Sequence, residues 1–441
     1  MYYILKFIVM RLYAIIKIKL PVFCVSVLFL SMSAGIQAYA QASDMPEMPE
    51  SFNEFKGTVV DKASGNPLPF TTILLMGTNI STVTNTEGEF SLKVSSLLKN
   101  GRISLRYMGY KNRVVSLSEL LHEKTRIEME AIAVELPEVS VISKDAKALV
   151  EAMMDKKGEN YANDETQMTA FYRETIKKNK TYASLSEAVV DIYKQSYASY
   201  KTDVVKMYKA RKRTDYSKVD TLVFKLMGGP FNSLYLDIMK NPSMIFTDEM
   251  IKNYEFSFDR STRLDNRLIY VVDFIQSVNN NEPLYFGKLY IDAENLALKS
   301  AVFKLNIQDR EASSRMFIIR KPLNARVYPI EANYRIDYIE RDGKWYYGYS
   351  RIELGLRINW KRRLFNTTYY STIEMAVTDW EKAGTEKPAN RKDRLRPSVI
   401  VSDAASGFND PDFWGEFNVI EPEKSIETAI KKIQKRLEKK E

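Results

Sequence analysis

The residues of this chain that could carry out chemistry are few. Its 441 residues contain one histidine, His122, and one cysteine, Cys24. A metal site usually needs several ligands and a general base needs a partner that orients it, so a lone histidine favours a structural role. The sequence contains neither a Gly-rich phosphate loop nor a serine nucleophile elbow. We therefore predict no catalytic residue, no metal site and no cofactor.

Carboxylates are the remaining candidates for catalysis. Four acids gather around the pair Phe413 and Trp414: Asp403, Asp410, Asp412 and Glu416. Two acids beside aromatic side chains could serve glycoside hydrolysis. No spacing here fixes the separation of the carboxylates, and acids are common in loops, so a polar loop anchored by a buried aromatic residue is favoured. A carboxylate-dependent hydrolase that uses the acids between Asp410 and Glu416 is the alternative.

Aromatic residues are the other candidates for ligand contacts, and they make up 12% of the chain. Aromatic rings can stack on sugars or line an apolar groove. Because side chains alternate between the two faces of a strand, about half of these rings are expected to lie in a core. Our candidate ligand-binding residues are Trp345, Tyr347, Tyr349, Tyr369 and Trp414.

Most of these aromatic residues lie in a region that alternates as strands do. Runs rich in β-branched and aromatic residues are separated by turn residues from residue 254 onward. The expected strands are 268–275, 284–291, 297–307, 315–320, 330–340, 345–356 and 368–380. Asp342-Gly343 predicts a two-residue hairpin turn, because this dipeptide tolerates a positive φ. Consecutive strands joined by short turns predict a large curved antiparallel sheet.

Helices are expected to flank this sheet. Apolar residues recur at helical spacing in 145–158, and residues 222–250 predict two short helices broken at 228–230. In 422–440, Ile426 and Ile430 belong to one apolar stripe that predicts a C-terminal amphipathic helix. The second domain is therefore expected to be a mainly antiparallel α+β fold.

The stretch from Phe55 to Tyr110 has the regularity of a separate module, with short β-rich runs between turn residues. Its motifs are Gly57-x-Val59-x-Asp61, Pro67-Leu68-Pro69, Gly77-Thr78, Thr84-Asn85-x-x-Gly88-x-Phe90-x-Leu92 and Tyr107-x-Gly109-Tyr110. This pattern resembles the carboxypeptidase regulatory-like domain. The resemblance implies a seven-stranded, transthyretin-like β-sandwich that brings no catalytic residues with it.

Two further resemblances concern the rest of the chain. The runs 168–174 and 185–193, with Gly228-Gly229-Pro230 and residues 413–418, are similar to an exported Bacteroidetes family of unknown function. That resemblance implies a place in the periplasm or at the outer membrane. Residues 286–301 are similar to the strand-turn-strand of the lipoprotein-carrier (LolA-like) half-barrel, a family whose sheet holds acyl chains.

The first forty residues favour export. A basic start, an apolar run at 21–30 and the ending Ala38-Tyr39-Ala40 predict a cleaved signal peptide. A retained membrane anchor is the alternative, because 8–20 is also apolar, but each run is shorter than the about 20 residues that a span requires. Cleavage would remove Cys24 and leave no cysteine for disulfides or thiol chemistry.

The net charge of +9 is spread over several basic clusters. Such clusters can bind nucleic acid, but an exported protein meets lipid headgroups and anionic glycans instead. A TonB-dependent transporter is excluded, because about 300 residues are too few for a barrel of many strands. The expected segments are 1–40 signal peptide, 41–53 tether, 54–132 sandwich, 133–160 linker and helix, 161–420 α+β domain and 421–441 C-terminal helix.

These observations favour a non-enzymatic cell-envelope protein. Its sandwich would be a docking module, and its curved sheet would bind an apolar or glycan ligand. The expected partners are an outer-membrane or envelope protein and a lipid or glycan, without nucleic acid. The alternatives are the hydrolase and a purely structural envelope component. An acyl-sized cavity would favour binding, carboxylates facing across a cleft would favour the hydrolase, and a filled core would favour the structural role.

Overall fold

A computed structural model describes ten stretches of the chain. They are residues 51–98, 100–120, 125–132, 145–214, 228–277, 282–317, 324–361, 366–382, 390–405 and 413–437. All of them belong to one compact unit, Ser51–Glu441. The predicted signal peptide, most of the tether, His122, Asp410 and Asp412 lie outside the described residues. The predicted segment boundaries stay predictions.

The first seven strands form two small sheets with a common core. The strands are β1 (Phe52–Asp61), β2 (Thr72–Leu75), β3 (Ser81–Val83), β4 (Glu89–Ser95), β5 (Arg102–Arg106), β6 (Arg113–Ser116) and β7 (Thr125–Met129). One sheet has the order β4-β1-β7 and the other β3-β2-β5-β6. Val59, Ile73, Leu92, Ile103 and Leu105 are fully buried in the core that the two sheets share. The predicted seven-stranded sandwich is confirmed.

A glycine explains one close approach inside this sandwich. Gly88 precedes β4 with φ of 74°, and a Cβ atom there would lie 2.5 Å from the carbonyl oxygen of Val59. Only a residue without a side chain fits both conditions. Gly88 therefore lets the turn before β4 close over β1.

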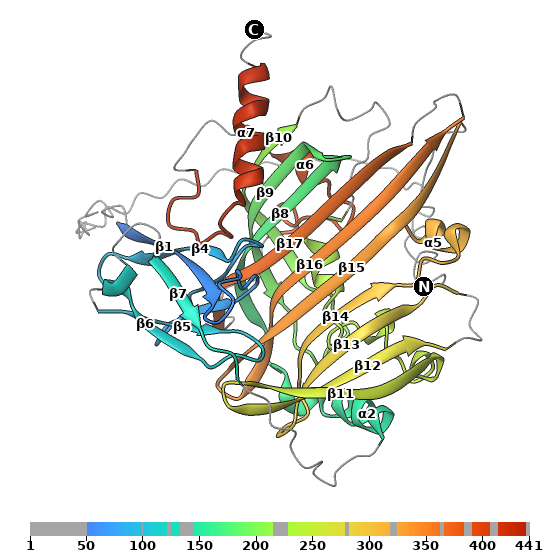
Figure 1. Cartoon of the computed structure of the whole chain (residues 1–441), viewed down its shortest axis with the longest axis horizontal. Helices are drawn as coiled ribbons and strands as arrows, with labels where there is room; N and C mark the ends of the chain where they lie inside the picture. The colour runs from blue at the N-terminus through green and yellow to red at the C-terminus, as the bar shows by residue number, and fades with distance from the viewer. Residues whose placement is uncertain are drawn as a thin grey trace, which may run out of the picture. The chain divides into compact units, whose positions relative to one another are not determined.

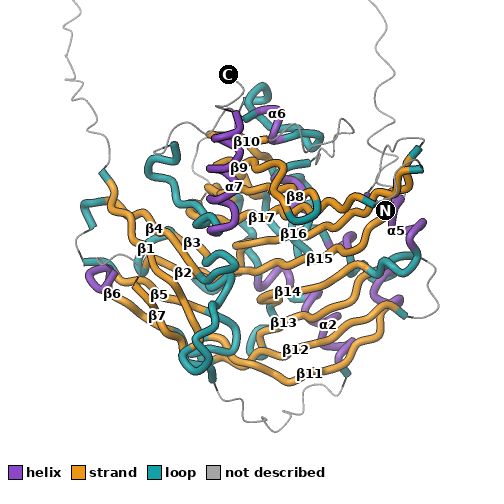
Figure 2. The backbone as a smooth tube through the Cα atoms, turned by 45° about the horizontal axis from the view of Figure 1, so that its top comes forward, coloured by secondary structure: helices purple, strands orange, loops and turns teal. Residues whose placement is uncertain are grey.

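The rest of the chain is dominated by one sheet of ten strands. They are β8 (Thr166–Lys178), β9 (Thr181–Lys194), β10 (Val204–Thr214), β11 (Tyr254–Leu264), β12 (Arg267–Gln276), β13 (Tyr285–Asp292), β14 (Leu298–Leu305), β15 (Ala325–Arg341), β16 (Lys344–Trp360) and β17 (Thr367–Lys382). Their order is β10-β9-β8-β17-β16-β15-β14-β13-β12-β11, and neighbours are antiparallel. Figures 1 and 2 show a curved, open sheet with β10 and β11 at its edges. The predicted large antiparallel sheet is confirmed.

Local turns and one distant pairing set the register of this sheet. Arg341 and Lys344 face each other across the predicted turn, where Asp342 and Gly343 have φ of 50° and 72°. Both central residues thus adopt the positive φ that a two-residue hairpin needs. The last strand, β17, pairs with β8. This pairing joins the two groups of strands into one sheet through residues about 200 positions apart, such as Glu374 and Arg173.

Short helices cover one face of this sheet, which we call the helical face. They are α2 (Ala146–Asp155), α3 (Lys157–Asn160), α4 (Pro230–Tyr235), η2 (Pro242–Met244), η3 (Met250–Asn253) and α6 (Val401–Ala404). The opposite face, which we call the sandwich face, carries side chains that contact the sandwich and residues 413–421. The core of the ten-stranded sheet lies on the helical face.

One expectation about local structure needs correction, and one strand was not predicted. The predicted strand at 315–320 begins as a helix, α5 (Arg310–Phe317), because Asp309 accepts hydrogen bonds from the backbone N–H of Glu311 and Ala312 and so caps a helix N-terminus. Strand β10 was not predicted, since its lysines and arginines hide the alternation of Val205 with polar residues. The C-terminal helix, α7 (Lys424–Leu437), lies where it was expected.

Candidate functional site

The sandwich face of the large sheet carries a row of charged side chains across its strands. Arg211, Glu187, Arg173, Glu374 and Arg351 are direct cross-strand neighbours on β10, β9, β8, β17 and β16. Because paired residues point to the same face of a sheet, the register alone brings these five side chains together. We call them the charged row.

Ion pairs of alternating sign run along the charged row. Glu187 accepts from Arg211 at 2.8 Å and from Arg173 at 2.7 Å, and Glu374 lies 3.2 Å from Arg173 and 3.1 Å from Arg351. Burial alone would raise the pKa of Glu187, but Arg173 and Arg211 outweigh it and hold that pKa below its usual value. Burial would lower the pKa of Arg173, but Glu187 and Glu374 raise it. Glu187 and Arg173 are therefore both ionised at neutral pH.

The residues that cover the charged row complete its hydrogen bonds. Arg173 is 2% exposed and donates to the carbonyl oxygen of Ile420 at 2.7 Å. Trp414 packs edge-on against Phe171, and the Arg211 guanidinium lies over the Trp414 ring. Residues 413–421 thus lie on the sheet, and they are needed there because a buried guanidinium must find a partner for each N–H group.

A single aromatic residue of the sandwich reaches the end of the row. Phe70 stacks on Tyr349, with ring centroids 5.6 Å apart, and the guanidiniums of Arg335 and Arg351 each lie 5.3 Å from the centre of the Phe70 ring. Its φ of 62° is unusual for a residue with a bulky side chain. The ring is close to both of two arginines that the register places opposite each other. Cation–π attraction replaces their repulsion.

Polar contacts hold the sandwich beside Phe70. The Ser81 hydroxyl donates to the carbonyl oxygen of Val377 at 2.9 Å, where a bulge in β17 leaves that carbonyl off the regular ladder. The Asn418 side chain bonds both backbone groups of Lys93, at 2.7 and 3.1 Å. The Gly109 amide donates to the carbonyl oxygen of Arg263 at 2.8 Å. These polar contacts fix the position of the sandwich on the sheet beside the apolar contact that Phe70 makes.

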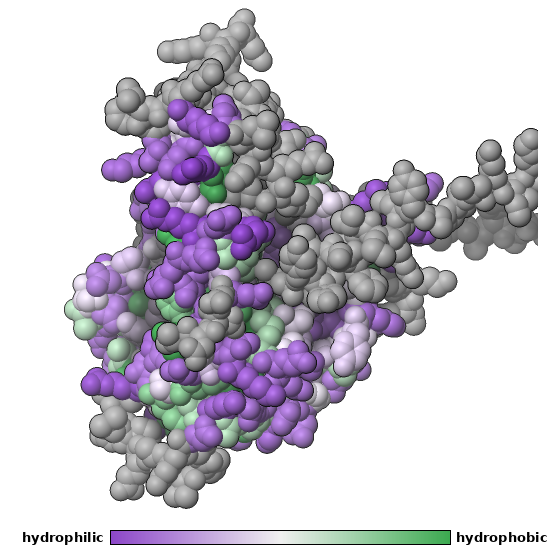
Figure 3. Space-filling view, turned by 90° about the vertical axis from the view of Figure 1, so that its right-hand side faces the viewer, coloured by the Kyte–Doolittle hydropathy of each residue, from purple (hydrophilic) through white to green (hydrophobic). Residues whose placement is uncertain are grey.

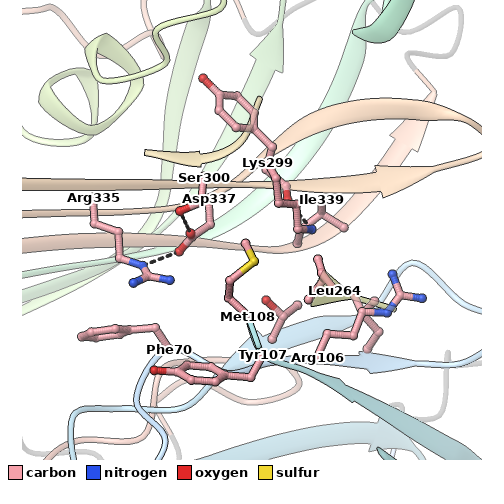
Figure 4. Close-up of a pocket in the computed structure, with 13 residues that line it drawn as sticks. Phe70, Arg106, Tyr107, Met108, Leu264, Lys299, Ser300, Arg335, Asp337 and Ile339 are labelled. Atoms are coloured by element: carbon pink, nitrogen blue, oxygen red, sulfur yellow. Dashed lines mark hydrogen bonds and ion pairs between the residues drawn. The ribbon is translucent and has the colours of Figure 1, made fainter. Parts of the chain in front are cut away.

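A small cavity remains between the sandwich and the sheet, with a volume of about 40 Å³. In Figure 4, Phe70, Tyr107 and Met108 approach from the sandwich, and Lys299 and Asp337 approach from the sheet. Asp337 pairs with Arg335 and accepts from Ser300. Ligand pockets usually measure about 300 to 1,000 Å³, so this cavity suits a few atoms only.

Lys299 is the unusual residue of that cavity. Its ammonium donates to the carbonyl oxygen of Tyr338 at 3.0 Å and lies 4.7 Å from the centre of the Trp345 ring. Burial lowers the pKa of Lys299 to about 8, against a smaller opposing effect of Asp265. The lysine can therefore lose its proton near physiological pH.

The helical face of the sheet is filled by apolar side chains of its cover. The segment 228–253 contributes buried residues to the same core as the sheet, namely Leu234, Leu236, Ile238, Met239, Ile245, Phe246 and Ile251. One polar cluster fastens this segment: Asp237 is fully buried, 2.8 Å from the ammonium of Lys194, and accepts from the Tyr338 hydroxyl at 2.9 Å. The described cover leaves this face packed.

Farther along the helical face, polar residues interrupt the apolar surface. Glu174 is 3% exposed, and its carboxylate accepts a hydrogen bond from the Tyr172 hydroxyl at 3.0 Å. Burial raises the pKa of Glu174 to about 7, and the Tyr172 hydrogen bond opposes this only in part. Among the described residues, the buried hydroxyls of Ser186 and Ser371 find no hydrogen-bond partner. This group separates two apolar clusters of the face.

All five candidate ligand-binding residues are buried, and the structure distributes them over three clusters. Trp345 and Tyr347 lie in the core of the helical face, Tyr369 lies in a smaller cluster with Ile176, and Tyr349 and Trp414 lie under the sandwich and residues 413–421. They are 0% to 6% exposed. The structure brings Tyr349 and Trp414 together and does not bring the five into one site; their role in ligand binding stays a prediction.

Of the four candidate acids, Asp403 and Glu416 are described and both are exposed to solvent. The pairing of two carboxylates across a cleft stays a prediction, because Asp410 and Asp412 lie outside the described residues. Within the part of the chain that the structure describes, no group of three His, Cys, Asp or Glu residues is placed to hold a metal ion. In the same described part, no helix is long and apolar enough to cross a membrane.

A family model described as "CarboxypepD_reg-like domain" matches residues 55–141. The seven N-terminal strands are a carboxypeptidase regulatory-like domain. This confirms the resemblance that the sequence motifs carry. No curated protein sequence matches the chain.

Several solved structures are similar to part of this chain. A DUF1329 family protein from Desulfovibrio piger has a TM-score of 0.22 and 10% identity, over 56% of this chain and 96% of its own. A LolA superfamily protein from Nitrosomonas europaea has a TM-score of 0.21 and 9% identity, over 55% of this chain and 96% of its own. Lipovitellin has a TM-score of 0.25 and 7% identity, over 53% of this chain and 27% of its own.

We predict that Arg173→Met destabilises the protein by about 3 to 5 kcal/mol, because the change leaves Glu187 and Glu374 buried without their central partner. Arg315→Met is the matched control: its pair with Glu311 is exposed, with side-chain exposures of 69% and 90%, and removing it should cost about 0 to 1 kcal/mol. Urea unfolding measures both values. Equal small losses would show that the charged row contributes no more than a surface pair.

We predict a pH effect at Lys299. Its lowered pKa means that the unfolded chain binds more protons than the folded chain above pH about 8, so the protein gains stability as pH rises through the range between about 8 and 10.5. Between pH 7.5 and 9.5, the wild type should gain about 2 kcal/mol relative to Lys299→Met. Lys304→Met, at an exposed lysine of β14, should show no such gain. Parallel pH profiles for the wild type and Lys299→Met would contradict this account.

Proposed function

We propose that this protein is a non-enzymatic structural component of the cell envelope. In this role the regulatory-like domain is fixed on the sandwich face of the large sheet, and the joined pair presents its outer surface to other envelope components. The observation that supports the proposal is that each face of the sheet is covered over part of its area, one by the apolar side chains of 228–253 and the other by Phe70 and residues 413–421.

The distribution of exposed residues is consistent with contacts to other macromolecules over a broad surface. Large apolar residues with at least 37% exposure occur on both parts of the protein, among them Met76 and Leu97 on the regulatory-like domain and Tyr200 and Ile275 beside or on the sheet. The side of the molecule in Figure 3 mixes hydrophilic and hydrophobic residues over its described surface. Scattered apolar residues of this kind are ordinary on a protein surface, so the partner is identified by experiment.

A second candidate function is the binding of an apolar or glycan ligand on the helical face. One feature favours it: the segment 228–253 contains only short helices, the longest of them α4 with six residues, and its underside is apolar. Displacement of this segment would expose an apolar surface that includes Trp345 and Tyr347. The ion pair between Lys194 and Asp237, which we call the latch, would then hold the segment 228–253 against the sheet.

The experiment that tests the proposal is mass spectrometry of lipids and glycans that co-purify with the protein from its own envelope without detergent exchange. A structural component should carry nothing above the background of a mock purification. A lipid or glycan bound in stoichiometric amount would contradict the proposal and support the second candidate. Asp237→Asn, which weakens the latch, should then change the amount recovered.

A genetic complementation experiment distinguishes the structural role from the hydrolase activity. A strain that lacks the protein is complemented with the wild type or with the combined variant Asp403→Asn, Asp410→Asn, Asp412→Asn and Glu416→Gln. Equal restoration of envelope resistance to bile salts is the expected result. If the variant is folded and present at wild-type level but does not restore resistance, the structural role is contradicted and the hydrolase is supported.

A further inference from the structure

A basic segment lies at the edge of the large sheet, beside the first residues of β10. The backbone N–H of Leu395 donates to the carbonyl oxygen of Val205 at 2.8 Å, and Arg394 pairs antiparallel with Lys206. Within six residues this segment exposes four cations and one acid to solvent, namely Arg391, Lys392, Arg394, Arg396 and Asp393. We call residues 391–396 together with Lys206 the basic edge. Backbone pairing with the sheet holds its positive charges in one place.

An exposed aromatic side chain lies in the loop next to the basic edge. Tyr200 belongs to the loop 195–203, which leads from β9 into the end of β10 that pairs with the basic edge. Its relative exposure is 105%. The loop is nevertheless fastened, because the Lys240 ammonium donates to the carbonyl oxygens of Ser196 and Ser199 at 2.6 and 2.5 Å. Hydrogen bonds therefore hold the loop in a conformation that presents an aromatic ring to solvent.

We propose that the basic edge and Tyr200 form a surface that binds the anionic headgroups of a phospholipid bilayer. Cations gathered on one surface attract a partner of opposite charge. Lysine and arginine side chains near an anionic bilayer each strengthen its binding, and a tyrosine ring prefers the level of the headgroups, where its body is in an apolar layer and its hydroxyl in water. A soluble polyanion would attract the cations but would offer no apolar layer to the ring of Tyr200.

This inference rests on the proposed function, because it names one envelope component that the outer surface of the protein contacts. Binding of this kind is reversible, and salt weakens it by screening the charges. It takes place at the edge of the sheet and requires no lipid inside the core. A bilayer contact at the basic edge is therefore separable from the stoichiometric lipid or glycan that would contradict the structural role.

The test is flotation of the full-length protein with vesicles of phosphatidylcholine alone or of phosphatidylcholine and phosphatidylglycerol in equal parts. The wild type should bind the mixed vesicles more tightly, and added salt should weaken that binding. The combined variant Arg391→Gln, Lys392→Gln, Arg394→Gln and Arg396→Gln should lose about fivefold in affinity for each charge removed. Tyr200→Ser should also weaken binding, but with an unchanged salt dependence, because it removes no charge.

The matched control removes four exposed cations from other elements: Arg102→Gln, Arg113→Gln, Lys252→Gln and Arg326→Gln. Both combined variants have the same net charge and keep residues 1–50, so they differ only in the surface that loses its charge. The control should retain the binding of the wild type.

Equal losses in the two combined variants would overturn the proposal, because net charge alone would then explain the binding. Equal binding of the wild type to both kinds of vesicle would also overturn it. If the variant of the basic edge lost binding to heparin and kept its binding to vesicles, the partner would be an anionic glycan and not a membrane. These results leave the structural role intact, because that role is tested by the lipids and glycans that co-purify with the protein.

Discussion

The charged row depends on being covered, and much of the architecture follows from that need. Arg173 and Glu187 are 2% and 1% exposed in the middle of a sheet face, where ions lose their hydration. Their charges are balanced across the strands, but a guanidinium has further N–H groups that must be bonded. The carbonyl oxygen of Ile420 supplies one acceptor. Residues 413–421, from the C-terminal part of the chain, therefore have to lie on β8 and β9 to complete the hydrogen bonds of the row.

The same constraint explains how the regulatory-like domain is attached. The row ends at Arg351, which the register places opposite another arginine, Arg335. Phe70 lies close to both guanidiniums and stacks on Tyr349, at the expense of a backbone conformation with positive φ. Strained residues persist where surrounding contacts over-determine them. The domain is therefore a folded module that also contributes side-chain contacts to the sandwich face of the sheet.

Much of the fold could be predicted, because it is encoded locally. The motifs of the sandwich and the Asp342-Gly343 turn depend on residues near in sequence, and both are found where expected. The charged row depends on the pairing of β8 with β17, which unites residues about 200 positions apart, so a single strand reveals only one charge inside an apolar run. The aromatic candidates failed to gather in one place for a related reason. Alternation predicts that a side chain is buried, but not which face it lies on once a bulge shifts the register, as Gly348 does in β16 between Tyr347 and Tyr349.

Calorimetry tests most directly whether the regulatory-like domain and the ten-stranded sheet are one cooperative structure. If the charged row and Phe70 join them, heating the wild type should give a single transition that includes both parts. Phe70→Ala should separate this into two transitions, because the change removes the ring that contacts Tyr349, Arg335 and Arg351 and leaves the main core of each part intact. Two resolved transitions in the wild type, unchanged in Phe70→Ala, would contradict the account.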